Sequence, residues 1–311
     1  MNIVFFGTPD WTEPFLEALA HDAAIHVVGV VTRSDKPAGR QSLLTSPPIK
    51  HAADRLKIPV FQFSTLKNSE AEQQLCALNA DIFVVVAYGR LIPKEILKIP
   101  RLGCVNMHPS LLPRHRGPSP MIAAIEQGDA TTGISIMLLD ETMDTGPLLA
   151  QISFPLGTSP TIVQLIRTVE TEGPRLLRET LKQYAAGKIM PKPQSTEGVT
   201  VTRLLTREDG QVDWTKSADE ILRRFRAYQG WPDSWSVWTR GDKALRLKFL
   251  AMEPIASTGL PGHVRVKDGR MFVGTGDQEI EILRVQPEGK AGMDAKDFLR
   301  GYSDVNEAVL A

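Results

Sequence analysis

An amide and an imidazole stand two residues apart in the segment Cys-Val-Asn-Met-His-Pro, where a run of apolar residues stops. Side chains at positions i and i+2 of a strand point to the same face, so Asn106 and His108 can converge on one bound atom. Both groups can donate a hydrogen bond, and two donors aimed at one oxygen form an oxyanion hole. The imidazole can also move protons near neutral pH.

A carboxylate follows in a second turn. The segment Gly-Ile-Ser-Ile-Met-Leu-Leu-Asp predicts a strand over 133–140, and the turn after it carries Asp140, Asp144 and Gly146. If this strand lies beside the first, a carboxylate can reach His108, orient its ring and favour its charged form. An Asn–His–Asp set in a strand-end cleft predicts acyl-type transfer through a tetrahedral intermediate. A turn with satisfied polar groups is the alternative that these residues leave open.

Other kinds of site lack their residues. Ser110 is not in the G-x-S-x-G turn that presents a nucleophile, and His108 and His115 have no third ligand at metal-binding spacing. The first strand-to-helix turn holds only Gly7, whereas a dinucleotide fingerprint needs three glycines, and no GxxxxGK[ST] loop occurs. A metal, NAD, FAD or a nucleoside triphosphate is therefore not predicted.

The first half of the chain alternates short apolar runs with amphipathic segments, which predicts an α/β fold. The expected architecture is a Rossmann-like, mostly parallel sheet with helices on both faces. Strands are predicted over 3–7, 25–32, 59–63, 81–89, 103–108 and 133–140, and helices over 12–20, 47–56, 69–79, 119–127 and 161–187. The last helix is expected to break near Gly173 and Pro174.

The pattern of apolar and polar residues changes after residue 188. Residues 1–188 are predicted to form one domain, 189–203 a polar, Gly- and Pro-rich linker, and 204–311 a small β-barrel preceded by a helix. Arg223, Arg224 and Arg226 could form a local basic patch on that helix, and a solvated helix face is the alternative.

Composition narrows the class of protein. The chain has 311 residues, 42% of them apolar and 23% charged, as in soluble globular proteins. No run of about 18 apolar residues or signal peptide is found, so no membrane partner is expected. Cys76 and Cys104 do not form a CxxC pair, which favours a reducing, cytoplasmic location. The 36 basic and 36 acidic residues balance, so the net charge gives no sign of nucleic-acid binding.

The segment Asn-Met-His-Pro-Ser-Leu-Leu-Pro-Arg-His-Arg-Gly, followed 36 residues after His108 by the turn Asp144-Thr-Gly, resembles the signature of the folate-dependent formyltransferase family. Further stretches resemble the branch of that family that acts on initiator methionyl-tRNA. They are MNIVFFGTPDWTEPFLEAL, the KPAGR and SPPIK ends of the loop 36–50, VVVAYGRLIPKEIL, TREDGQVDW and ILRRFRAYQGWPDSW, and together they cover nearly the whole chain.

The resemblance implies transfer of the formyl group of 10-formyltetrahydrofolate to the methionine amine of initiator Met-tRNA, for translation initiation, by a monomer that needs no metal. Asn106 and His108 would stabilise the oxyanion, and Asp144 would orient His108 and help to take the amine proton. The folate site would comprise Tyr88, Gly89, Arg90, Leu91, Ile92, Leu139, Asp140, Ser110, Leu111, Leu112 and Pro113.

Contacts with tRNA are implied for the loop 35–50, which in the family wedges at the open end of the acceptor stem and here carries Lys36 and Arg40. The C-terminal domain resembles an OB-like barrel, which suits tracking of an RNA backbone. Where the family has Gly-Lys-Lys, this chain has Gln41-Ser42-Leu43, so two charges that could meet phosphates are missing.

Three more positions differ from the usual family pattern, but none is in the catalytic set. His115 and Ser119 replace Trp and Ala, and Arg90 stands where Leu is usual. The alternatives are a sugar N-formyltransferase, a 10-formyltetrahydrofolate hydrolase and a non-enzymatic folate- or RNA-binding protein. The loop 36–50 and the C-terminal barrel favour the tRNA enzyme over the sugar enzyme.

Overall fold

The computed structural model describes residues 1–38 and 43–311, which divide into two compact units. The first unit comprises 1–121, 131–155 and 164–203, and the second comprises 122–130, 156–163 and 204–311. This division concerns compactness alone, so the functional boundaries 1–188, 189–203 and 204–311 stay a prediction.

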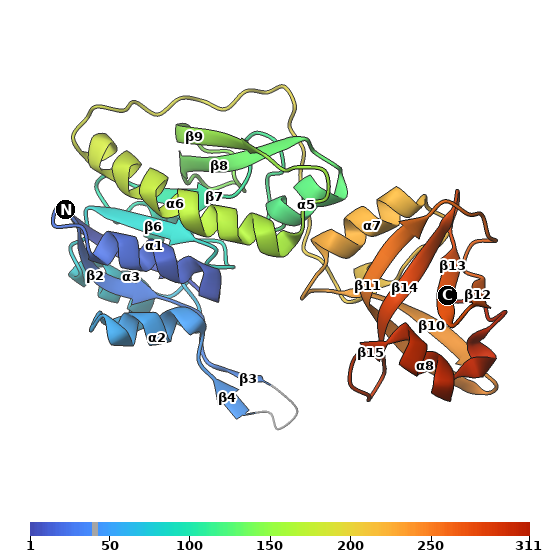
Figure 1. Cartoon of the computed structure of the whole chain (residues 1–311). Coiled ribbons are helices and arrows are strands. Elements are labelled where there is room, and N and C mark those ends of the chain that lie inside the picture. Colours follow the sequence, from blue (N-terminus) through green and yellow to red (C-terminus); the bar gives the residue numbers. More distant parts are fainter. Residues whose placement is uncertain (39–42) are drawn as a thin grey trace. The chain divides into compact units, whose positions relative to one another are not determined.

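The first unit is built on a seven-stranded sheet (Figure 1). Its strands, in spatial order, are β5 (Val60–Phe61), β2 (His26–Val31), β1 (Asn2–Gly7), β6 (Ile82–Val86), β7 (Cys104–His108), β8 (Thr131–Leu138) and β9 (Leu148–Pro155). The first five are parallel, whereas β8 runs antiparallel to β7 and β9 antiparallel to β8. The central strands are apolar and buried, as expected for a sheet covered on both faces. The predicted mostly parallel sheet is confirmed, but β9 was missed.

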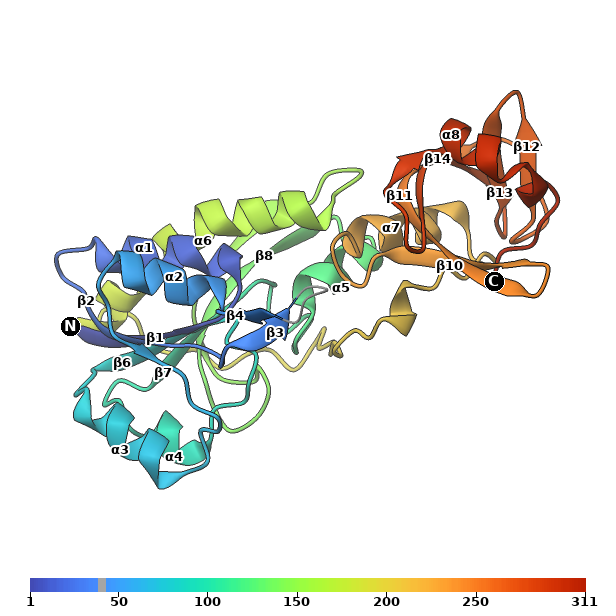
Figure 2. The same ribbon diagram turned by 90° about the horizontal axis from the view of Figure 1, so that it is seen from below.

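Helices cover both faces of this sheet (Figures 1 and 2). One face carries α1 (Glu13–Ala20), which the short helix η1 (Asp10–Thr12) precedes, α2 (Pro48–Arg55) and α6 (Ile162–Ala185), and the other carries α3 (Ser69–Ala77) and α4 (Lys94–Leu97). The helix α5 (Pro120–Glu126) follows the loop after β7.

The predicted break in the long helix is wrong, because α6 continues through Pro174. Val169 and Leu177, on either side of the proline, are fully buried, so packing on the sheet holds the helix together. Gly173 lets α6 approach α1 closely, since a Cβ atom there would lie 2.4 Å from the ring of Phe15.

The loop 35–50 contains a short hairpin formed by β3 (Lys36–Ala38) and β4 (Leu43–Thr45), with Lys36 opposite Thr45. Its base is anchored by Asp35, whose carboxylate accepts hydrogen bonds from Gln62 at 2.6 Å and Lys50 at 3.1 Å. These contacts, the Gln62 bond first, lower the pKa of Asp35. Lys36 is exposed. The predicted tRNA residue Arg40 lies outside the described residues.

The second unit contains an antiparallel sheet, in agreement with the predicted OB-like domain. Its strands, in spatial order, are β10 (Ser234–Arg240), β11 (Lys243–Ile255), β14 (Glu279–Pro287), β13 (Arg270–Gly274) and β12 (Val264–Lys267), with β15 (Met293–Asp294) beside β14. The helical segments are η2 (Glu208–Gly210), α7 (Ala218–Ala227), α8 (Ala295–Gly301) and η3 (Ser303–Val305). The chain end links both edges of the sheet, because Leu310 bridges to Trp238 and Val309 to His263.

The helix α7 carries the arginines that were candidates for a basic patch. It begins with a capping box in which Ser217 and Glu220 satisfy each other's backbone amides. Arg223 pairs with Asp219 one turn earlier, and the guanidinium of Arg224 lies 5.3 Å from the centre of the Tyr228 ring. Neighbours within the unit therefore engage two of the three arginines.

Candidate active site

The strand β7 pairs in parallel with β6 on one side and antiparallel with β8 on the other. Asn106 and His108 lie on one face of this strand, opposite Met137 and Ser135 of β8. Only 8% of Asn106 and 4% of His108 is exposed. Within the described part of the chain the side-chain amide of Asn106 makes no hydrogen bond. This end of β7 therefore presents a nearly buried amide that a ligand could engage.

The ring of His108 is held between two neighbours. Its Nε2 lies 2.9 Å from the carbonyl oxygen of His115, which can only accept, so Nε2 carries the hydrogen. Its Nδ1 lies 3.7 Å from Oδ2 of Asp144. Burial lowers the pKa of His108 and outweighs the Asp144 carboxylate and the His115 carbonyl, both of which raise it. Asp144 was expected to favour the charged ring, and it does raise the pKa of His108. Burial has the larger effect, so the net shift of that pKa is downward.

Asp144 lies in the turn between β8 and β9. Its Oδ2 accepts a hydrogen bond of 2.7 Å from the backbone amide of Gly117. Asp144 has a backbone φ of 55°, in the left-handed region that non-glycine residues rarely occupy. Two residues on, a Cβ atom at Gly146 would lie 1.8 Å from the carbonyl oxygen of Leu138, so only glycine fits. The tight turn places the carboxylate of Asp144 beside β7.

The 189–203 segment contributes a residue that the sequence did not single out. Nε2 of Gln194 donates to the carbonyl oxygens of Asp144 and Gly146, each at 2.8 Å. Its Oε1 accepts from Nε and Nη2 of Arg116 at 3.1 and 2.8 Å. A lone glutamine in a polar segment carries no sequence signal of this role, because its partners lie far away in the chain.

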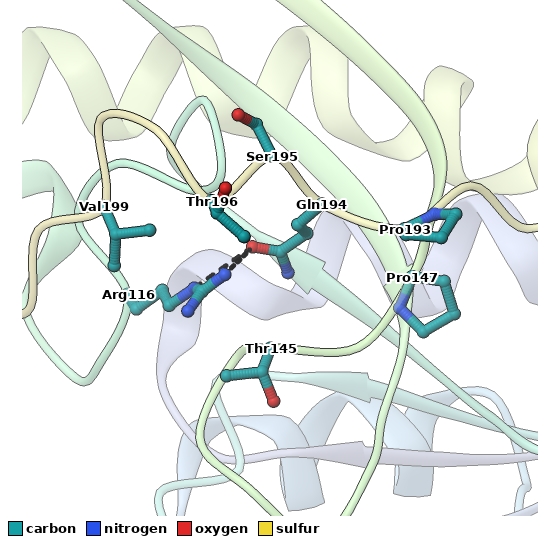
Figure 3. A pocket seen from close by; sticks show the side chains of 8 residues that line it. All are labelled: Arg116, Thr145, Pro147, Pro193, Gln194, Ser195, Thr196 and Val199. Carbon is teal, nitrogen blue, oxygen red and sulfur yellow. Dashed lines mark hydrogen bonds between the residues drawn. The ribbon is translucent and has the colours of Figure 1, made fainter.

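Arg116 and Gln194 face each other on the wall of a pocket of about 560 Å³ (Figure 3). The lining residues are Arg116, Thr145, Pro147, Pro193, Gln194, Ser195, Thr196 and Val199. None of the residues predicted for the folate site lines this pocket, although Thr145 adjoins Asp144.

The loop 110–113 is braced by β8 and β9. Ser110 is fully buried, and its hydroxyl donates to the carbonyl of Arg114 at 2.7 Å. The hydroxyl of Ser135 donates to the carbonyl of Ser110 at 2.6 Å and accepts from the amide of Leu112 at 3.1 Å. Leu111 and Pro113 are half-buried. The Ser110 side chain therefore shapes the loop.

The segment 88–92 follows β6, and its residues range from buried to exposed. Tyr88 is 1% exposed, packs edge-on against Phe6, and has a hydroxyl without a partner in the described part of the chain. Burial raises the pKa of that hydroxyl. Arg90 donates to the carbonyls of Phe63 and Ser64 at 2.9 and 3.0 Å. Gly89 and Leu91 are exposed and Ile92 is half-buried.

Leu139 and Asp140 begin the turn that carries Asp144. Leu139 is half-buried, and the exposed Asp140 accepts hydrogen bonds from Thr142 and Thr145. Burial alone would raise the pKa of Asp140, but the hydrogen bonds outweigh it and lower the pKa. Asp140 thus stabilises its own turn.

The described residues lack two further features. No helix among them is long and apolar enough to cross a membrane. They also contain no group of three or more His, Cys, Asp or Glu side chains that could hold a metal ion.

The sequence of this chain matches two family models. Residues 1–181 match the formyl transferase family, and residues 204–303 match the formyl transferase C-terminal domain. The chain therefore belongs to the formyl transferase family. It is 44% identical over 304 residues to the methionyl-tRNA formyltransferase of Roseiflexus sp. (strain RS-1), a likeness that covers 97% of this chain and 92% of that relative.

Solved structures share the fold at low sequence identity. An N-formyltransferase from Helicobacter canadensis, in complex with folinic acid and dTDP-3-aminofucose, has a TM-score of 0.64 at 16% identity and covers 90% of this chain and 98% of its own. HypX from Aquifex aeolicus, in complex with tetrahydrofolic acid, has a TM-score of 0.63 at 18% identity and covers 97% of this chain and 47% of its own.

Proposed function

We propose that this protein is an enzyme that transfers the formyl group of 10-formyltetrahydrofolate to the α-amine of methionine on initiator Met-tRNA. The observation that carries the proposal is the likeness to a methionyl-tRNA formyltransferase over 97% of the chain. The amide, imidazole and carboxylate beside β7 give that activity a chemical basis.

When the two substrates are bound, the amine nitrogen bonds to the formyl carbon, the bond from that carbon to N10 breaks, and one proton passes from the amine to N10. Asn106 would donate to the formyl oxygen as negative charge develops there. His108, which the resemblance pairs with Asn106 in this role, donates its Nε2 hydrogen to the His115 carbonyl, so it could join only when Nδ1 is protonated. The Asn106 amide is nearly buried and has no hydrogen-bond partner among the described residues, so a substrate oxygen would supply the acceptor that it lacks. Asp144 and His108, 3.7 Å apart, would hold the proton in transit.

The folate would bind along 88–92, 110–113 and 139–140, beside the end of β7. Support for a folate ligand comes from the neighbours solved with folinic acid and tetrahydrofolic acid. The exposed Leu91 offers an apolar contact. Ser110 would contribute through its loop, since its own hydroxyl is used by Arg114.

The tRNA would contact Lys36 and Arg40 on the loop 35–50 and the domain over 204–311, which 189–203 joins to the catalytic domain over 1–188. The exposed position of Lys36 supports this assignment. We further propose that the protein acts as a cytoplasmic monomer without a metal. Light scattering of the purified protein tests the monomer, and a second peak at twice the mass would contradict it.

The deciding experiment measures formyl transfer from 10-formyltetrahydrofolate to initiator and elongator Met-tRNA, with Asn106→Ala and Asp144→Ala beside the wild type. Rapid labelling of the initiator alone, lost in both variants, is expected. Formate release without labelled tRNA would instead identify a hydrolase, and labelling of an amino-sugar nucleotide would identify a sugar enzyme. Binding of folate or RNA without turnover would mean that the protein is not an enzyme.

A further inference from the structure

We propose that Gln194 is a positioning residue that holds the β8–β9 turn so that Asp144 faces His108. The inference deepens the function proposed above and rests on the same site. It assigns a role in catalysis to the segment 189–203, which the sequence presents as a linker.

The amide group of Gln194 is used completely. Its two N–H bonds meet two carbonyls of the turn, those of Asp144 and Gly146, at 2.8 Å each. Its oxygen takes both N–H groups that Arg116 directs at it, at 3.1 and 2.8 Å. An amide is required for this pattern, because no other side chain combines two donors with an acceptor in one plane.

The turn needs such a clamp because its conformation is strained. Asp144 has a φ of 55°, and residues in this region persist only when their surroundings fix them. The Gln194 bonds hold the backbone on both sides of Thr145, while the Gly117 amide holds the carboxylate at 2.7 Å. The two contacts act on different atoms of Asp144, so the loss of Gln194 would free the backbone and let the carboxylate move from His108.

The consequence for catalysis is one of geometry. A displacement of about 1 Å in a reacting group can lower a rate about 100-fold. Among the described residues, the groups that face His108 are Asp144 and His115. The Asp144 carboxylate and the His115 carbonyl both raise the pKa of the ring, and the charge of the His115 side chain lowers it. If the carboxylate moves away, His108 should titrate at lower pH. This second readout needs no substrate.

The experiment uses the full chain with Gln194→Ala, Gln194→Glu and, as a matched control, Thr196→Ala. Gln194→Glu places a carboxylate oxygen against the two turn carbonyls, so it should be at least as harmful as Gln194→Ala. Thr196 is exposed on the same pocket wall, two residues along. Transfer kinetics, thermal unfolding and NMR titration of the His108 ring are measured for each.

We expect both Gln194 variants to lower kcat about 10- to 100-fold with little change in KM, and to move the His108 titration to lower pH. Thr196→Ala should match the wild type in all three readouts. An unchanged His108 titration in folded Gln194 variants would overturn the inference, whether or not activity falls. If the wild type itself transfers no formyl group, the proposed function fails, yet the titration still decides the role of Gln194.

Discussion

Nδ1 of His108 lies 3.7 Å from Oδ2 of Asp144, although the two residues are 36 positions apart and belong to β7 and to the β8–β9 turn. Because Nε2 donates to the His115 carbonyl, a neutral His108 turns a lone pair toward the carboxylate. A proton placed between Nδ1 of His108 and the Asp144 carboxylate would be shared by two acceptors. Burial lowers the pKa of His108, so the ring is neutral before it receives that proton. The pair is therefore arranged to receive a proton, and Asn106 remains as the donor for a developing oxyanion.

This division of roles predicts the behaviour of Asn106→Ala. Loss of one oxyanion donor should lower kcat by about 10²- to 10³-fold. The unfolding temperature should change little, because the amide makes no hydrogen bond in the described part of the chain. Transfer assays and thermal unfolding check both parts. A large loss of stability would show that the amide has a structural role.

The lowered pKa of His108 predicts how stability depends on pH. An unfolded histidine titrates near pH 6.5, whereas the folded ring titrates lower, so the unfolded state binds more protons between the two values. The contribution of neutral His108 to the free energy of unfolding should therefore be fully present above about pH 6.5. It should fall as the pH drops toward the native pKa, by at most about 1.4 kcal/mol per pH unit.

The variant His108→Asn should remove that part of the pH dependence, so the stability curves of wild type and variant should converge as the pH falls. Urea unfolding at a series of pH values measures the difference. Parallel curves would mean that His108 does not titrate differently in the folded protein. The remaining histidines are common to both proteins and cancel in the comparison.

The β8–β9 turn predicts a strong effect of Gly146→Ala. The new methyl group would lie 1.8 Å from the Leu138 carbonyl, so the backbone must shift. We expect a loss of about 1–3 kcal/mol in the free energy of unfolding, together with reduced activity because Asp144 is displaced. Gly301→Ala is the matched control for stability, since the φ of Gly301 is not in the left-handed region and its added Cβ meets nothing within 4 Å. A Gly146→Ala variant that is no less stable than the control variant would contradict this account of the turn.

The sequence is sufficient to predict the main sheet and the convergence of Asn106 and His108, because apolar runs and the two-residue repeat of a strand are local properties. The same reasoning missed β9 and α8, whose patterns are weak, and broke α6 at Pro174, where packing outweighs the cost of proline. It also missed Gln194. Its partners Asp144 and Arg116 are 50 and 78 residues away in the chain, and such distant hydrogen bonds leave no local pattern.

The thiol of Cys104 offers a probe of the strand that carries the candidate site. Cys104 lies on β7 two residues before Asn106, is 2% exposed, and has its pKa raised by burial to about 12. Cys76 is exposed. A thiolate-specific reagent at pH 8 should therefore modify one thiol per folded chain quickly and the second only as the protein unfolds, since the thiolate is the reactive form. Peptide mapping should place the fast label on Cys76. Rapid labelling of Cys104 at a rate independent of denaturant would show that β7 opens locally in the folded protein, and the rigid placement of Asn106 and His108 would then be wrong.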